Sequence, residues 1–437
     1  MFQYFQSLKP VQLTMLSLMT ACPTLLYAES PNSNEQQLHL EIQDLRSRLE
    51  KLQAQVDASA VSSSSMTVQP SGTAKGTEPK QASEKLVGSN VSVGSAISDT
   101  QLHLYGFVRA DASYQFKGGN GIFNHINKAD LQGTTTHQDQ FYTTVTTSRI
   151  GLDLKTKIAD QEVGGKLEFD FRGGTDASAA RVRHAYITYQ NWLIGQTTSN
   201  FLANEFIPEI VDFGSPVGVG TIRTPMLRYS NRFSPATQYS VALEQGRSDN
   251  RFPTLTGKLQ YKFPKNKGSI ALRGLTQEVR ANTTDPKTAL SWGVALGAGY
   301  HVTNRLTLKG DYSHIKGDDR FMLYSNTAFD TTTTSHLNLN EFDTLSLGLT
   351  YQFMPTLRGT FGYGAILANT NNAYAQKARS SHDTTQNKQL QQGWINLMYS
   401  PVAPLTFGIE YIYGERQTFD GVVGKDSRIE TMVRYNF

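Results

Sequence analysis

The last ten residues, Arg428-Ile-Glu-Thr-Met-Val-Arg-Tyr-Asn-Phe437, decide the class of fold. Side chains of an extended strand point alternately to its two faces. One face of this segment therefore carries Ile429, Thr431, Val433, Tyr435 and Phe437, whereas the other carries Arg428, Glu430, Met432, Arg434 and Asn436. A largely apolar face opposite a polar one, ending on an aromatic residue, predicts the closing strand of a transmembrane β-barrel.

The composition fits a barrel wall better than other membrane folds. Hydrophobic residues make up 38% of the 437 residues, and no uninterrupted apolar run after the N-terminus is long enough for a membrane-spanning helix. The 20 Tyr, 22 Phe and 36 Gly suit aromatic girdles and tightly turned strands. A net charge of +4 gives no support for nucleic-acid binding, so no nucleic-acid partner is expected.

The N-terminal 28 residues resemble a secretory signal peptide. Lys9 precedes an apolar stretch at 11–26, and Ala28 precedes a polar run, so cleavage is expected after Ala28. The only cysteine, Cys22, follows Met-Thr-Ala and loosely resembles a lipoprotein cleavage site. If the segment is removed as a signal peptide, the mature chain has no cysteine and forms no disulfide.

Residues 29–56 are predicted to form a short α-helical coiled coil. Apolar residues recur at alternating spacings of four and three, the a/d seam of a heptad repeat: Leu38, Ile42, Leu45, Leu49, Leu52 and Val56. An amphipathic helix packed on its own barrel is the alternative. Residues 57–101 are rich in Ser, Thr, Gly, Ala and Lys and are predicted to be a flexible linker.

Residues 102–437 are predicted to form a 16-stranded antiparallel transmembrane β-barrel, which makes the fold class all-β. Segments of alternating polarity recur throughout this region, and the connections between them alternate between short turns and longer loops. The four longest loops are expected at 115–146, 198–223, 316–341 and 367–389. Such asymmetry is typical of bacterial outer-membrane barrels, in which lipid is the partner of the outer face.

A barrel of this size leaves an aqueous lumen, so function should depend on the residues that line it. Inward-facing cations are expected to outnumber anions. The expected cations are Arg109, Arg149, Lys155, Lys157, Lys166, Arg172, Arg181, Arg183, Arg228, Lys258, Lys262, Arg273, Lys309, Arg358, Arg428 and Arg434, and the anions are Asp111, Asp153, Glu168, Asp170, Glu244, Asp311, Glu410 and Glu430.

Guanidinium groups hold carboxylate or phosphate by paired hydrogen bonds, so small anionic solutes are the expected partners. The residues predicted to bind them are Arg109, Arg149, Arg181, Arg183, Arg228, Arg273 and Arg358. Any single charge can instead be an ordinary solvated lumen group.

The connection at 198–223 is the predicted constriction. Phe201 and Phe206 are apolar groups that an exposed loop would not normally carry, and they favour a loop folded into the barrel. Glu205, Glu209 and Asp212 lie on the same loop and are expected to face Arg149, Arg181, Arg183 and Arg228 across the narrowest point. An ordinary extracellular loop or a contact with a neighbouring subunit is the alternative.

Signatures of catalysis were sought without success. The sequence has no phosphate-binding loop, serine elbow, zinc-type histidine pair or dinucleotide turn. We therefore expect no enzymatic activity, no catalytic residues, no cofactor and no metal site.

Several motifs together resemble the DcaP-like outer-membrane porins. They are Leu104-Tyr-Gly-Phe-Val-Arg-Ala-Asp-Ala-Ser-Tyr114, Ser148-Arg-Ile-Gly-Leu-Asp153, Arg183-His-Ala-Tyr-Ile187, Ile194-Gly-Gln-Thr197 with Asn200-Phe201, Arg228-Tyr229 and the terminal Phe437. The resemblance implies a homotrimer of barrels that passes small anionic solutes, dicarboxylates among them, with the coiled coil of residues 29–56 in the periplasm. The alternatives are a phosphate-selective porin, a trimeric surface or adhesion protein anchored by its barrel and, least favoured, an outer-membrane hydrolase.

Overall fold

The computed structural model describes residues 90–92 and 100–437 except 135, 176–177, 285 and 331–335, together with Gln43 and Ser47. The chain divides into two units, Met1–Gln81 and Ala82–Phe437. Gln43 and Ser47 are helical, but the rest of the predicted signal peptide and coiled coil lies outside the described residues. Among the described residues, no helix has the length and apolarity needed to cross a membrane.

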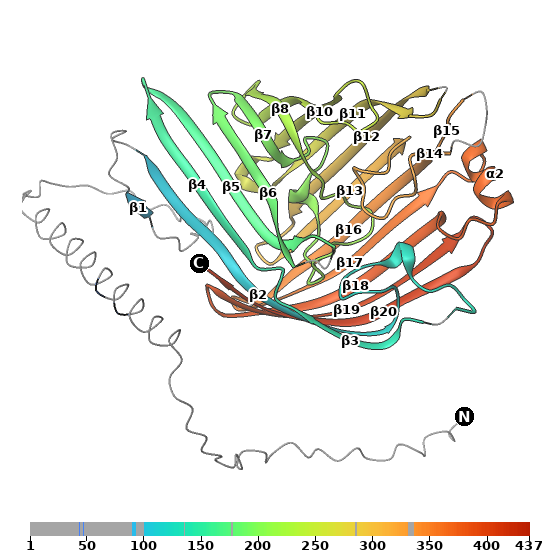
Figure 1. Ribbon diagram of the computed structural model, residues 1–437. Helices are drawn as coiled ribbons and strands as arrows, with labels where there is room; N and C mark the ends of the chain where they lie inside the picture. Colours follow the sequence, from blue (N-terminus) through green and yellow to red (C-terminus); the bar gives the residue numbers. More distant parts are fainter. Residues whose placement is uncertain are drawn as a thin grey trace, which may run out of the picture. The chain divides into compact units, whose positions relative to one another are not determined.

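The second unit is dominated by one antiparallel sheet that closes on itself (Figure 1). Its strands are β1 (Asn90–Ser92), β2 (Gln101–Lys117), β3 (Gln138–Thr144), β4 (Arg149–Ile158), β5 (Gln161–Gly173), β6 (Ala179–Tyr189), β7 (Trp192–Thr198), β8 (Arg223–Arg232), β9 (Thr237–Glu244), β10 (Thr254–Lys262), β11 (Gly268–Ala281), β12 (Lys287–His301), β13 (Leu306–Lys316), β16 (Glu341–Met354), β17 (Leu357–Ala368), β18 (Asn387–Val402), β19 (Leu405–Thr418) and β20 (Val423–Asn436). The other elements are the two-stranded β14 (Phe329–Asp330) and β15 (Asn338–Leu339), helix α2 (Ala373–Ser380) and the 3₁₀ turns η1 (Ile126–Lys128), η2 (Asn204–Phe206) and η3 (Pro264–Asn266).

The barrel wall has sixteen strands, as the sequence predicts, although the sheet has eighteen segments. Strand β1 only adds three residues beside β2, within the segment predicted as a linker. Strands β3 and β4 follow one another along the same edge of β2, so they act as one interrupted wall strand. The extent predicted for the first long loop, 115–146, is therefore wrong, because β2 continues to Lys117 and β3 occupies part of that range.

The barrel closes between its first and last wall strands. Strand β20 pairs with β2 from Phe107↔Asn436 onward, and Gly106 and Phe437 exchange backbone hydrogen bonds at 3.0 and 3.1 Å. The faces of β20 are those predicted: Val433 and Tyr435 are 42% and 51% exposed on the outside, whereas Arg428 is fully buried inside. Along the other strands, apolar side chains that point outward likewise alternate with polar side chains that point inward.

The connections differ sharply between the two ends of the barrel. Strand pairs at one end, here called the turn rim, are joined by turns of two to five residues, such as 190–191 and 263–267. The other end, the loop rim, carries the four long loops 118–137, 199–222, 317–340 and 369–386. This is the alternation that the sequence predicts.

Three of the long loops fold inward and build an apolar core inside the barrel. Ile126 of loop 118–137, Phe201 and Val217 of loop 199–222 and Phe321 of loop 317–340 are buried in one cluster. Inward-facing residues of the wall complete it: Leu275, Ala295, Ile315, Phe342, Ile366 and Leu390. Because these wall residues belong to β11, β12, β13, β16, β17 and β18, the core fills one side of the lumen.

Closure of the barrel predicts a strong effect of substitution at Gly106. A Cβ atom there would collide with the carbonyl oxygen of Arg149, because β2 and β4 approach closely, whereas a Cβ at Gly257 meets nothing within 4 Å. We expect Gly106→Val to destabilise the barrel by about 1–3 kcal/mol, and Gly257→Val to be tolerated. Urea-unfolding midpoints and heat-modifiable electrophoretic mobility measure both; equal stabilities would contradict the close approach.

Candidate functional site: the charged lumen and its inward loop

Loop 199–222 lies inside the barrel and is held there through its backbone. Its backbone carbonyl groups accept hydrogen bonds from wall side chains: Phe201 from Arg273 at 3.0 Å, Ile207 from Lys309 at 3.2 Å, Glu209 from Trp394 at 3.0 Å and Val211 from Arg109 at 2.5 Å. Phe201, Phe206 and Val211 are buried. Wall side chains thus replace the hydrogen bonds that a strand or helix would supply to a buried backbone.

The carboxylates of this loop do not pair with the arginines expected from the sequence. Glu205 pairs with Lys258 at 2.5 Å, Glu209 with Arg358 at 2.8 Å and Asp212 with Arg428 at 3.5 Å. The expectation that Glu205, Glu209 and Asp212 face Arg149, Arg181 and Arg183 is therefore wrong, whereas Glu205 does line one cavity with the fourth expected arginine, Arg228. The reason is the path of the loop, which crosses from β10 past β17 to β20 rather than along β4 and β6.

A buried carboxylate cluster anchors the far end of the loop. Glu410 accepts hydrogen bonds from the backbone N–H groups of Val211 and Asp212, both at 3.0 Å. It lies opposite Glu430 in the β19–β20 register. Arg428 contacts Asp426 at 2.8 Å, Glu430 at 3.5 Å and Asp212. Three buried carboxylates therefore contact one guanidinium, and Glu410 lies beside them, so the four carboxylates cannot all be ionised at low cost.

Arg149, Arg181 and Arg183 come together on strands β4 to β6, around two carboxylates. Arg149 and Arg183 both contact Glu168, at 3.4 and 2.9 Å. Arg181 and Arg183 both contact Asp170, at 2.6 and 2.7 Å. Three guanidiniums share two carboxylates, so one positive charge is left over. We call this group the arginine cluster.

The other predicted arginines lie apart from the arginine cluster. Arg109 pairs with Asp111 and Arg273 with Asp311, and each also holds loop 199–222. Arg358 pairs with Glu209 of the loop. Arg228 lines a cavity near the turn rim, and its Nε is buried without a hydrogen-bond partner among the described residues. The seven predicted arginines therefore divide into a cluster of three, three that hold the loop and one in the cavity.

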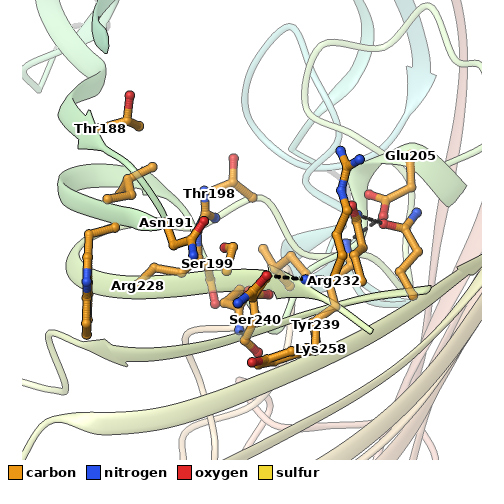
Figure 2. Close-up of a pocket in the computed structure, with 18 of the residues that line it drawn as sticks. Thr188, Asn191, Thr198, Ser199, Glu205, Arg228, Arg232, Tyr239, Ser240 and Lys258 are labelled. Carbon is orange, nitrogen blue, oxygen red and sulfur yellow. Dashed lines mark hydrogen bonds and ion pairs between the residues drawn. The ribbon is translucent and has the colours of Figure 1, made fainter. Parts of the chain in front are cut away.

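That cavity lies between loop 199–222 and strands β6 to β10 and has a volume of about 770 Å³. Figure 2 shows Arg228, Ser240 and Lys258 from the wall and Ser199 and Glu205 from the loop around it. The apolar core fills the other side of the lumen, so this cavity lies on the side that the core leaves open.

Sequence reasoning missed the inward course of loops 118–137 and 317–340. Phe123 and Ile126 of the first loop are buried, and so are Phe321 and Met322 of the second. Apolar residues in a long loop were the sequence feature that predicted the inward course of Phe201 and Phe206. The same feature is present in these two loops. Asp426, which completes the carboxylate cluster, was also missed because it precedes the ten residues used to define the last strand.

No group of three or more His, Cys, Asp or Glu residues suited to a metal occurs in the part of the chain that the structure describes. The lumen instead offers charged and hydrogen-bonding groups around a water-accessible space. Such a site can select solutes by non-covalent contacts.

A closed sixteen-stranded barrel with an apolar outside, a charged lumen and an inward-folded loop defines the class of outer-membrane porins and channels. The family model of the DcaP outer membrane protein matches residues 35–437. The chain therefore belongs to the DcaP outer membrane protein family, which confirms the resemblance drawn from its motifs.

Solved structures agree with this assignment. The outer membrane channel DcaP of Acinetobacter baumannii is 36% identical, with a TM-score of 0.74 over 79% of this chain and 100% of that one. OmpT of Vibrio cholerae, at 12% identity, has a TM-score of 0.52 over 80% of this chain and 100% of its own. An anion-selective porin from Comamonas acidovorans, at 11% identity, has a TM-score of 0.52 over 78% and 100%. The last two show the fold alone. No curated protein matches the sequence.

The anchoring role of Glu410 predicts a loosened loop when its carboxylate is removed. Glu410→Ala leaves two buried backbone N–H groups of loop 199–222 without their acceptor, and each such bond to a charged group contributes about 1.5–3 kcal/mol. We expect faster proteolysis within the loop and noisier single-channel currents. Glu415→Ala on the same strand, whose side chain is about half exposed, is the matched control. Identical proteolysis of the two variants would contradict the anchoring role.

The carboxylate cluster also predicts a dependence of loop docking on pH. Burial raises the pKa of Asp212 above its ordinary value of 3.8, and Arg428 offsets this only in part. The docked loop therefore binds this proton more tightly than the released loop. Docking of the loop is therefore strongest at a pH below the ordinary pKa of Asp212. It weakens as the pH rises from that value through the raised pKa that Asp212 has in the docked loop. We expect current noise to increase as the pH rises above about 4, and Glu430→Gln to flatten the increase. A wild-type channel whose noise is independent of pH would rule this out.

Proposed function

We propose that this protein is a diffusion channel that prefers small anionic solutes, dicarboxylates among them, and selects them without covalent chemistry. The observation that carries the proposal is the unequal charge of the arginine cluster, in which three guanidiniums share two carboxylates. A positive excess on a wall of low dielectric constant concentrates anions and repels cations.

The arrangement of the lumen supports a route along one side. Loops 118–137, 199–222 and 317–340 fill the side formed by β11 to β18 with apolar groups. The arginine cluster on β4 to β6 and the cavity beside β6 to β10 occupy the other side. An anion that follows this side meets the arginine cluster and then Arg228. Loop 199–222 narrows the route, so solutes pass close to these cations.

Dicarboxylates suit the arginine cluster because its guanidiniums already hold carboxylates. Glu168 and Asp170 each accept hydrogen bonds from Arg183, and Asp170 also accepts them from Arg181. The side chain of Arg181 is 44% exposed, so an incoming carboxylate can share its fork. Exchange between fixed and mobile carboxylates binds a solute briefly, as conduction requires.

We also propose that three barrels associate as a homotrimer in the outer membrane, with residues 29–56 as a coiled coil in the periplasm after removal of residues 1–28. The heptad spacing of these residues supports this, since so short a seam needs several chains to bury it. Residues 57–101 would then link the coiled coil to the barrel.

The charge of the arginine cluster predicts the effect of neutralising two of its members. Arg149→Gln combined with Arg181→Gln changes the group from one excess positive charge to one excess negative charge. In a planar bilayer with a salt gradient, the wild-type reversal potential should indicate anion preference, and that of the double variant should shift towards cation preference. A short dicarboxylate should block the wild-type current, and the variant should need about tenfold more for half block.

Arg251→Gln, in the loop between β9 and β10, removes a guanidinium paired with Glu278 outside the lumen and serves as the matched control. A cation-selective wild-type channel would contradict the proposed function. Stronger block by phosphate than by the dicarboxylate would favour the phosphate-selective alternative.

A further inference from the structure

The cavity near the turn rim has a lining distinct from that of the arginine cluster. None of Arg149, Arg181 and Arg183 contributes to it; its walls come from the turn-side ends of β6 to β10 and from the start of loop 199–222 (Figure 2). Its volume of about 770 Å³ lies within the usual range of small-molecule sites. It can therefore hold a solute together with several water molecules.

The lining has an excess of positive charge. Arg228, Arg232 and Lys258 are its cations, and Glu205 is its one carboxylate among the described residues. Glu205 is held by Lys258 at 2.5 Å, so these two charges compensate each other. The guanidiniums of Arg228 and Arg232 remain, and no ion pair with a described residue engages either. A carboxylate is the solute group that best matches a guanidinium fork.

The neutral part of the lining points to a second kind of group on the solute. Amide side chains such as Gln190, Gln238 and Gln260 alternate with hydroxyl groups such as Ser230 and Ser240. Amides and hydroxyls both donate and accept hydrogen bonds, as solute hydroxyl groups do. The carbon chain of a simple dicarboxylate offers these groups no hydrogen bond in place of the water that it displaces, which weakens binding.

Two features show that this lining is ordered and can accept carbon as well. The Ser240 hydroxyl donates to the side chain of Asn200 at 2.5 Å, and Gln238 and Gln260 are joined at 2.6 Å. Leu193 and Leu202 provide an apolar patch beside these polar groups. Sugars and sugar acids present both C–H surface and hydroxyl groups, so they match such a mixed wall.

We propose that this cavity is a binding subsite for hydroxylated carboxylates of the sugar-acid class, in which Arg228 holds the carboxylate and the Ser and Gln side chains hold the hydroxyl groups. The inference rests on the proposed function in one respect, that the lumen admits anions. It adds a solute class and a second site, on the turn side of the arginine cluster.

The test compares solutes that differ in one feature at a time. Gluconate carries a carboxylate and hydroxyl groups, hexanoate has the same chain length and charge without hydroxyl groups, and sorbitol has hydroxyl groups without charge. Each is added to one side of the bilayer and then the other, and the half-blocking concentration of the single-channel current is measured. Gluconate added from the turn side should block at about tenfold lower concentration than hexanoate or sorbitol.

Two variants assign the block to the cavity. Arg228→Gln should raise the half-blocking concentration of gluconate about tenfold, since a charge-assisted contact is lost. Ser230→Ala with Ser240→Ala should reduce the advantage of gluconate over hexanoate and leave hexanoate block unchanged. Arg251→Gln should leave both unchanged. Wild-type unitary conductance shows that each variant is folded.

The outcomes separate this inference from the proposed function. Equal block by gluconate and hexanoate, or gluconate block that Arg228→Gln leaves unchanged, would overturn the subsite whatever the ion preference of the channel. A reversal potential that shows cation preference would overturn the proposed function, whereas gluconate block sensitive to both variants would still support the subsite.

Discussion

The structure depends on one constraint: a loop folded into a barrel must find hydrogen-bond partners for its backbone on the wall. Loop 199–222 has almost no regular secondary structure, yet it is buried beside the apolar core. Its backbone groups are satisfied by inward side chains of β2, β11, β13, β18 and β19, among them Arg109, Arg273 and Glu410. These side chains hold the loop in one path, and that path decides which part of the lumen stays open.

Because some lumen cations hold the loop, not all of them are available to attract a solute. A tally of inward residues gives twice as many cations as anions, but Arg109, Arg273 and Arg358 are committed to the loop and to wall carboxylates. Their charges are largely compensated where they stand. The arginine cluster differs because its guanidiniums outnumber the carboxylates they share, and Arg228 differs because it has no ion-pair partner among the described residues. The proposed selectivity therefore depends on local imbalance rather than on total charge.

Much of the wall could be predicted from the sequence, because the alternation of side chains along a strand is a local property. Val433 and Tyr435 face outward and Arg428 faces inward as their positions in the strand require. The partners of Glu205 and Glu209 could not be predicted in this way. They depend on how the loop crosses the lumen, which three loops decide together by packing Ile126, Phe201 and Phe321 against one another. Contacts of this kind join residues far apart in the chain and leave no period in the sequence.

The filling of one side of the lumen has a consequence for how the other side works. Packed apolar groups are nearly incompressible, so the core behind loop 199–222 gives the loop a firm support. Glu205 is thereby held beside Lys258, and no ion pair with a described residue engages Arg228 on the same cavity wall. A loop carboxylate placed beside Arg228 would compensate its charge and weaken the proposed preference for anions. The apolar core therefore helps to keep the charges along the proposed route unequal.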